Sequence, residues 1–130
     1  MHIFRVLITS TVCFIAATDV FASLDLSSTL NCSYQRGQIL DKDSAENVHN
    51  STPLNWTFNN LNTKSGMFMA GGDSGEVMAL PVFGGMAIYI PDKAGSHSFT
   101  IWSTGESIWN KQNNLLGTVY SQQYFGSCIN

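Results

Sequence analysis

The segment GEVMALPVFGGMAIYIPDKAGSHSFTIWSTGESIW, residues 75–109, decides the fold of this chain. It contains short apolar runs rich in aromatic and β-branched residues, separated by breaks of a few residues that contain glycine or proline. Consecutive antiparallel strands joined by short turns have this pattern. Side chains alternate between the two faces of a strand, so residues of one parity share a face. Met86, Ile88 and Ile90 share such a face, and Phe99 and Ile101 are predicted to face the core.

Strand patterns continue on both sides of this segment. Further strands are predicted over 29–34, 54–58, 67–70 and 118–124, with turns at 59–63, 71–75 and 113–114. The most polar segment, 41–53, is interpreted as a long loop or a single helical turn. The chain therefore belongs to the all-β class. We expect about seven or eight short strands in one small antiparallel meander, either a barrel or a sandwich.

The N-terminal residues, 1–22, have the composition of a secretory signal peptide. A single Arg5 precedes a mostly apolar run, and Val20-Phe21-Ala22 matches a small-residue cleavage pattern. The predicted organisation is thus a signal peptide over 1–22 and a single β domain over 23–130. The domain is expected outside the cytoplasm, secreted or periplasmic.

Two cysteines remain after removal of the signal peptide, Cys32 near the new N-terminus and Cys128 near the C-terminus. Two cysteines in an exported chain predict one disulfide bond. The bond would close a loop of nearly the whole domain, which stabilises it by roughly 4 kcal/mol in the chain-entropy model.

The charge pattern excludes some partners. The formal net charge is −3, and the basic residues of the domain are scattered singly. No basic patch is available for a phosphate backbone, so we expect no nucleic-acid binding. No second apolar segment reaches membrane-spanning length, so we expect no stable membrane insertion. The oligomeric state stays open.

The tetrapeptide Gly72-Asp73-Ser74-Gly75 resembles the nucleophile loop of chymotrypsin-like serine proteases. That chemistry needs a histidine base and an orienting acid beside the serine. His49 lies only some 25 residues upstream, the two-barrel protease fold needs about twice this length, and Glu76 replaces the family's usual glycine. A plain hairpin turn explains these residue types equally well. We expect no enzymatic activity, and a serine hydrolase that uses Ser74 is kept as an alternative.

The sequence predicts neither a metal site nor a cofactor. His49 and His97 form no His-x-His or Glu-x-x-His pair. The acidic group Asp41, Asp43 and Glu46 lacks the glycine and distal glutamate of a helix-loop-helix calcium site.

A group of aromatic residues allows three interpretations, the lining of a ligand cavity, a packed core or a partner surface. The group consists of Trp56, Trp102, Trp109, Tyr120, Tyr124 and Phe125. Trp102 has the opposite parity to Phe99 and Ile101, which places it on the outer face of a barrel. The candidate ligand or partner surface consists of Trp102, Trp109 and Tyr120.

The C-terminal third resembles the ending of small exported proteins of Gram-negative bacteria. The matching residues are Phe99-Thr-Ile-Trp102, Thr104-Gly-Glu-Ser-Ile-Trp109 and Gln122-Gln-Tyr-Phe-Gly-Ser-Cys128. The resemblance implies a compact exported β fold and no particular activity.

The predicted function is binding of a protein or a small apolar ligand by an exported, non-enzymatic β domain. A first alternative is an enzyme inhibitor, because Ser65-Gly-Met-Phe68 is similar to the Ser-Gly-x-x-Tyr loop of small periplasmic lysozyme inhibitors, which are also disulfide-linked β-barrels. A carrier of apolar ligands predicts a cavity in the barrel, whereas an inhibitor predicts a solid barrel with a protruding loop. A hydrolase requires a histidine within hydrogen-bond reach of Ser74.

Overall fold

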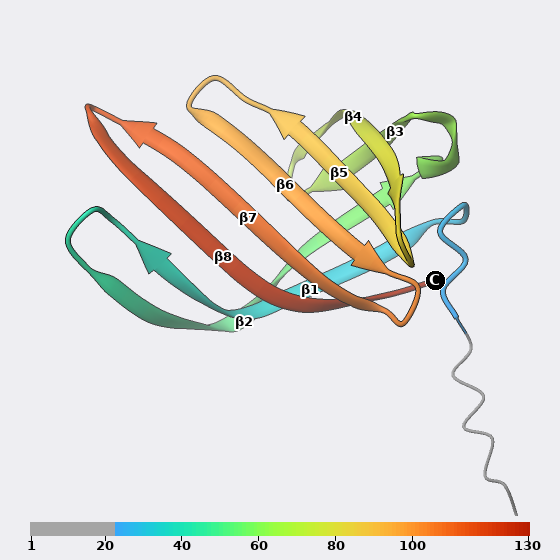
Figure 1. The fold of residues 1–130 in the computed structure, drawn as a ribbon, viewed down its shortest axis with the longest axis horizontal. Helices are drawn as coiled ribbons and strands as arrows, with labels where there is room; N and C mark the ends of the chain where they lie inside the picture. Colours follow the sequence, from blue (N-terminus) through green and yellow to red (C-terminus); the bar gives the residue numbers. More distant parts are fainter. Residues whose placement is uncertain (1–22) are drawn as a thin grey trace, which may run out of the picture.

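The computed structural model of the protein describes residues 23–130, and the predicted signal peptide lies outside the described residues. Eight strands each pair antiparallel with the next, and β8 pairs with β1 to close a barrel (Figure 1). The prediction of an all-β meander is confirmed, as a barrel. The strands are β1 Leu30–Leu40, β2 Ala45–Asn59, β3 Ser65–Ala70, β4 Asp73–Val82, β5 Gly85–Pro91, β6 Gly95–Trp102, β7 Glu106–Leu115 and β8 Thr118–Ile129, with one 3-10 turn, η1, at Leu61–Thr63.

The barrel interior is filled by alternate side chains of every strand. The inward positions predicted for Phe99 and Ile101 are confirmed, and the shared face of Met86, Ile88 and Ile90 is the inner one, since all five residues are buried. Aromatic rings occupy the centre: Phe99 lies edge-on to Phe58 at 5.0 Å between ring centroids and stacks on Trp109 at 5.6 Å. An eight-stranded barrel has an interior just wide enough to be filled in this way.

A buried hydrogen-bond chain links β1 to β7 and β6 inside the barrel. The Tyr34 hydroxyl lies 2.7 Å from Ser107 Oγ, which itself donates to the Thr100 carbonyl at 3.0 Å. Because the Ser107 proton is used on Thr100, Tyr34 is the donor to Ser107. Burial raises the pKa of Tyr34 to about 12, so the phenol is neutral throughout the physiological range.

The barrel is closed at one end and open at the other. Leu24 and Leu26 pack against the core, and Leu24 N donates to the Ser103 carbonyl at 2.8 Å. Leu61 of η1 is buried at the same end. At the opposite end the β1–β2 and β7–β8 hairpins extend past the neighbouring strands and form a taller wall on one side (Figure 1).

The prediction of a loop or helical turn over 41–53 is wrong. Only 41–44 form a turn, in which Asp41 Oδ1 accepts the backbone N–H groups of Asp43 and Ser44, and β2 begins at Ala45. This half of β2 pairs with β1 alone, because pairing with β3 is confined to Thr57–Asn59. With one edge free and polar residues on both faces, it lacks the alternation typical of a half-buried strand.

The turn predicted at Asn113-Asn114 is also wrong. Both residues belong to β7, and the hairpin turns two residues later, at Leu116 and Gly117. Their φ angles of 52° and 85° are the positive values that two-residue hairpin turns require. Leucine rarely takes this conformation, so the sequence gives no turn signal there.

The disulfide bond joins Cys32 of β1 to Cys128 of β8, as predicted. The two residues are direct register partners with Cα atoms 4.0 Å apart, so the bond lies across the seam where the first and last strands meet. A disulfide in a small β domain is compatible with an oxidising, exported location.

Reduction of this bond should lower the free energy of unfolding by about 4 kcal/mol, because it releases a loop of nearly the whole domain in the unfolded state. Urea denaturation with and without reductant measures the difference. A Cys32→Ser/Cys128→Ser double variant is the control and should be insensitive to reductant. Free alkylation of both cysteines in the native oxidised protein would contradict the bond.

Candidate functional site

The open end of the barrel contains a cavity of about 930 Å³, which we call the mouth. Its aromatic floor consists of Trp56 on β2, Phe68 on β3, His97 on β6 and Trp109 on β7. Its polar rim includes Asn55, Asp73, Glu76, Asp92 and Lys111. Six strands from β2 to β7 contribute to the lining, so the site exists only once the barrel has closed.

The floor is the uppermost layer of the packed core. Trp56 lies edge-on to the core residue Phe99 at 4.8 Å, and its ring centroid lies 5.2 Å from those of both His97 and Trp109. Phe68 lies 5.4 Å from Trp56 on the other side. Trp56 and Trp109 are 8% and 6% exposed, so a ligand would meet only their upper edges.

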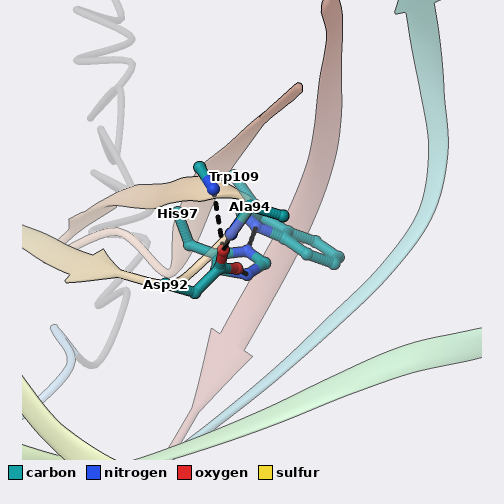
Figure 2. Close-up of polar contacts among 5 residues, drawn as sticks. Asp92, Ala94, His97 and Trp109 are labelled. Atoms are coloured by element: carbon teal, nitrogen blue, oxygen red, sulfur yellow. Dashed lines mark hydrogen bonds and ion pairs between the residues drawn. The ribbon is translucent and has the colours of Figure 1, made fainter. Parts of the chain in front are cut away.

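His97 has a fixed tautomer (Figure 2). The Trp109 indole N–H donates to His97 Nδ1 at 3.1 Å, and an indole nitrogen can only donate. The ring proton therefore lies on Nε2, which is 3.1 Å from Asp92 Oδ2. The other Asp92 oxygen, Oδ1, accepts the backbone N–H groups of Ala94 and Gly95 at 2.7 and 2.8 Å, and thereby fixes the β5–β6 turn.

The environment sets the charge of this pair. Burial lowers the pKa of His97, and the opposing effect of the Asp92 carboxylate does not reverse this. Burial on its own would raise the pKa of Asp92, but the two backbone N–H groups and the His97 ring together hold this pKa below its usual value. At neutral pH the ring is therefore neutral and Asp92 is a carboxylate.

The rim carries more negative than positive charge. Asp73, Glu76 and Asp92 belong to the lining together with a single lysine, Lys111, although alternation with the buried Val77 turns the Glu76 side chain to the outer face of β4. Within residues 23–130, the one ion pair joins Lys42 to Asp43, while His97 contacts Asp92 as a neutral ring. The Asp73 and Glu76 carboxylates thus have no cationic side chain as a partner.

The three residues of the predicted ligand surface lie in different places. Trp109 lines the mouth. Trp102 is half-buried on the outside of the barrel, in a groove of about 680 Å³ shared with Phe83, Ile108 and Phe125. Tyr120 is half-buried on β8 in the β7–β8 hairpin, opposite Asn113. The structure does not bring the three together.

The Gly-Asp-Ser-Gly segment has a structural explanation. Its turn is shorter than predicted: only Gly71 and Gly72 form it, and β4 starts at Asp73. Ser74 lines the mouth, as does His97, but both ring nitrogens of His97 already bond to Asp92 and Trp109. No Ser–His–Asp hydrogen-bonded chain is formed. A Cβ at Gly75 would lie 3.1 Å from the Phe68 ring, so the glycine makes room for that ring.

Other site types can be checked over the same part of the chain. Among residues 23–130, no three His, Cys, Asp or Glu side chains lie close enough together to hold a metal ion. Within that range no helix has the length and hydropathy needed to cross a bilayer.

The sequence analysis named Trp56 and Trp109 among the aromatic residues that could line a cavity, but it did not assign Asp73, Asp92 or His97 to a ligand site. The parity of His97 carried the signal, since it matches that of Phe99 and Ile101 and so places the ring on the inner face of β6.

The His97–Trp109 bond predicts a pH dependence of stability. Burial lowers the pKa of His97 below its ordinary value of 6.5. The stabilisation that the neutral, hydrogen-bonded ring contributes to the folded protein is therefore fully present above pH 6.5. It is lost as the pH falls below that value, because the unfolded chain takes up the proton first. Urea denaturation at about pH 7 and pH 5 should show a smaller fall in the free energy of unfolding for His97→Gln than for the natural protein. Glutamine keeps an acceptor for the Trp109 indole N–H but does not titrate in this range. His49 is present in both proteins and cancels. An equal loss in both would contradict the prediction.

The two tryptophan environments predict unequal costs of truncation. Trp109→Ala removes a buried ring from the core and should cost about 3–5 kcal/mol. Trp102→Ala empties only part of an outer groove and should cost about 1 kcal/mol. Urea denaturation of both variants measures the difference. A cost for Trp102→Ala as large as that for Trp109→Ala would mean that the outer groove is part of the core.

Comparisons of the chain with protein-family models, with curated proteins and with solved structures found no match. The geometry of the mouth is therefore the basis on which a function can be assigned.

Proposed function

We propose that this protein is an exported β-barrel that binds a small molecule with an apolar body at its mouth. The observation that carries the proposal is the cavity of about 930 Å³ at the open end of the barrel. Small-molecule sites commonly span 300–1,000 Å³, occur in the mouths of β-barrels, and combine aromatic walls with a few polar groups. The mouth has this size, location and composition.

The packing below the mouth limits how deep a ligand reaches. Phe58 and Phe99 are fully buried beneath Trp56, so their rings occupy the space directly below the mouth into which an apolar chain would extend. A ligand would rest its apolar side on Trp56, Phe68 and Trp109 and direct polar groups to the rim. This favours a compact molecule over a long fatty acyl chain.

The alternative functions have less support. The filled interior and the extended β1–β2 and β7–β8 hairpins match the general expectation for an inhibitor, a solid barrel with a protruding loop (Figure 1). The Ser65–Phe68 segment that suggested an inhibitor does not protrude, because these residues begin β3 and Phe68 lines the mouth. A Ser74 hydrolase would need a free histidine nitrogen, and His97 offers none. Secretion or a periplasmic location is part of the proposal, and the disulfide and the resemblance to exported Gram-negative proteins support it.

Titration with a neutral fluorescent naphthylamine tests the site. The probe should bind the natural protein with one-to-one stoichiometry and a blue-shifted emission. Gly75→Leu should abolish binding, because its side chain would enter the mouth beside Phe68. Gly72→Ala is the matched control, since a Cβ there meets nothing within 4 Å, and it should bind as the natural protein does.

Circular dichroism and thermal melting establish that both variants keep the fold. Equal binding by natural protein and folded Gly75→Leu would place the probe elsewhere, with the Trp102 groove as the first candidate. Absence of binding by the natural protein up to millimolar probe would count against a small-molecule function for the mouth.

A further inference from the structure

We propose that two copies of this chain associate through the outer groove that contains Trp102, and that each copy places its Phe83 ring in the groove of the other. The inference goes beyond the function proposed above, because the groove lies on the outer surface and shares no lining residue with the mouth. Three features carry it: a fully exposed aromatic ring, an apolar hollow beside that ring, and the area of the apolar surface around them.

The first feature is the Phe83 ring. Phe83 lies in the two-residue turn between β4 and β5 and is 101% exposed. The turn itself is fixed by its neighbour, because Gly84 takes a φ of 73° and its carbonyl accepts the Ser103 N–H at 2.8 Å. The turn therefore needs the glycine but not the aromatic ring, which makes no use of its apolar surface within one copy.

The second feature is the groove, which has a volume of about 680 Å³. Trp102, Ile108 and Phe125 supply its apolar surface, and Phe83 stands at its border. Trp102 and Ile108 are half-buried, and Phe125 is exposed. Glu106 is the one ionisable side chain of the lining. The groove thus has the room and the chemistry to accept a phenyl ring from outside.

A second copy of the chain is the occupant that fits both features at once. The ring and the hollow are adjacent on one face, so a two-fold axis that runs between them brings each ring over the hollow of the other copy. This is an isologous interface, in which every contact is made twice by the same pair of residues. A different partner would need its own hollow for Phe83 and its own ring for the groove.

The area of this face matches a weak dimer. Leu80 and Val82 extend the apolar surface along β4, and Val82 is separated from Trp102 only by Gly85 in the strand register. The exposed parts of Leu80, Val82, Phe83 and Phe125 amount to on the order of 500 Å² in each copy. Two copies would bury about 1,000 Å², the size at which specific interfaces begin. We therefore expect a reversible dimer with a Kd of about 10–100 μM.

Sedimentation velocity of the purified protein between about 1 μM and 1 mM tests the association. The mass should rise from that of one chain to that of two across this range. Phe83→Asp should weaken the dimer about a hundredfold or more, because two rings lose their burial. Leu116→Asp is the matched control: Leu116 is 107% exposed in the β7–β8 turn at the other end of the barrel, and its replacement should leave the Kd within about twofold.

Mixing two variants tests whether the rings are exchanged. Phe125→Lys alters the receiving groove and should also weaken the dimer of that variant. An equimolar mixture of Phe83→Asp and Phe125→Lys should recover the dimer, since one site then joins a natural ring to a natural groove and the other pairs the new aspartate with the new lysine. Both positions are exposed, and thermal melting of each variant establishes that the fold is kept.

A natural protein that stays monomeric up to about 1 mM would overturn the inference. A dimer that persists in Phe83→Asp, or that Leu116→Asp disrupts equally, would place the interface elsewhere and overturn it as well. A mixture that does not recover the dimer would contradict the exchange of rings. If monomeric protein binds phosphatidylcholine vesicles and Phe83→Asp abolishes that binding, the face docks on a lipid surface and the dimer is wrong. The mouth is tested separately by the naphthylamine titration.

Discussion

The pairing of β8 with β1 is the contact on which the other features depend, and the Cys32–Cys128 bond fixes it covalently. Without that seam the eight strands would form an open sheet with its apolar face exposed to water. The aromatic rings that pack around Phe99 would then lose their contacts with one another. Tyr34 lies two residues from Cys32 and bonds to Ser107 of β7 inside the barrel, so the seam between β1 and β8 is also tied to the next strand beyond β8. A single closure thus creates both the hydrophobic interior and the mouth above it.

The mouth shows how one set of residues serves both the packing of the barrel and the binding site that we propose at its open end. Asp92 holds the β5–β6 turn and at the same time contributes negative charge to the rim. Trp109 packs against the core while its indole N–H fixes the His97 tautomer. Gly75, part of a segment that resembles a protease motif, leaves room for the Phe68 ring. Because these roles coincide, most single substitutions at the mouth would affect packing as well as binding, and conservative variants at the rim are the more informative ones.

The core was predictable from sequence to a far greater extent than the site. Alternation grouped Met86, Ile88 and Ile90 on one face of β5 and identified Phe99 and Ile101 as inward residues of β6, because the buried residues of these strands alternate with more exposed ones. The polar first half of β2 was not predicted as a strand. It pairs along one edge only and so lacks the alternation of apolar and polar residues that identifies a half-buried strand. The turn at Leu116 was not predicted, because Asn113-Asn114 is the stronger local turn signal. The mouth could not be predicted, because the register of six strands decides which residues reach the same height, and local pattern does not encode that register.

The closed end of the barrel also determines the polarity of the whole domain. Leu24 packs against the core there, and Asn130 bonds to Asp25 through its side chain, so the two ends of the described chain lie side by side, away from the mouth. A tether or fusion partner attached at either end would leave the binding face pointing outward. The adjacent ends also make the domain a natural substrate for circular permutation, with new termini at the exposed Leu116-Gly117 tip.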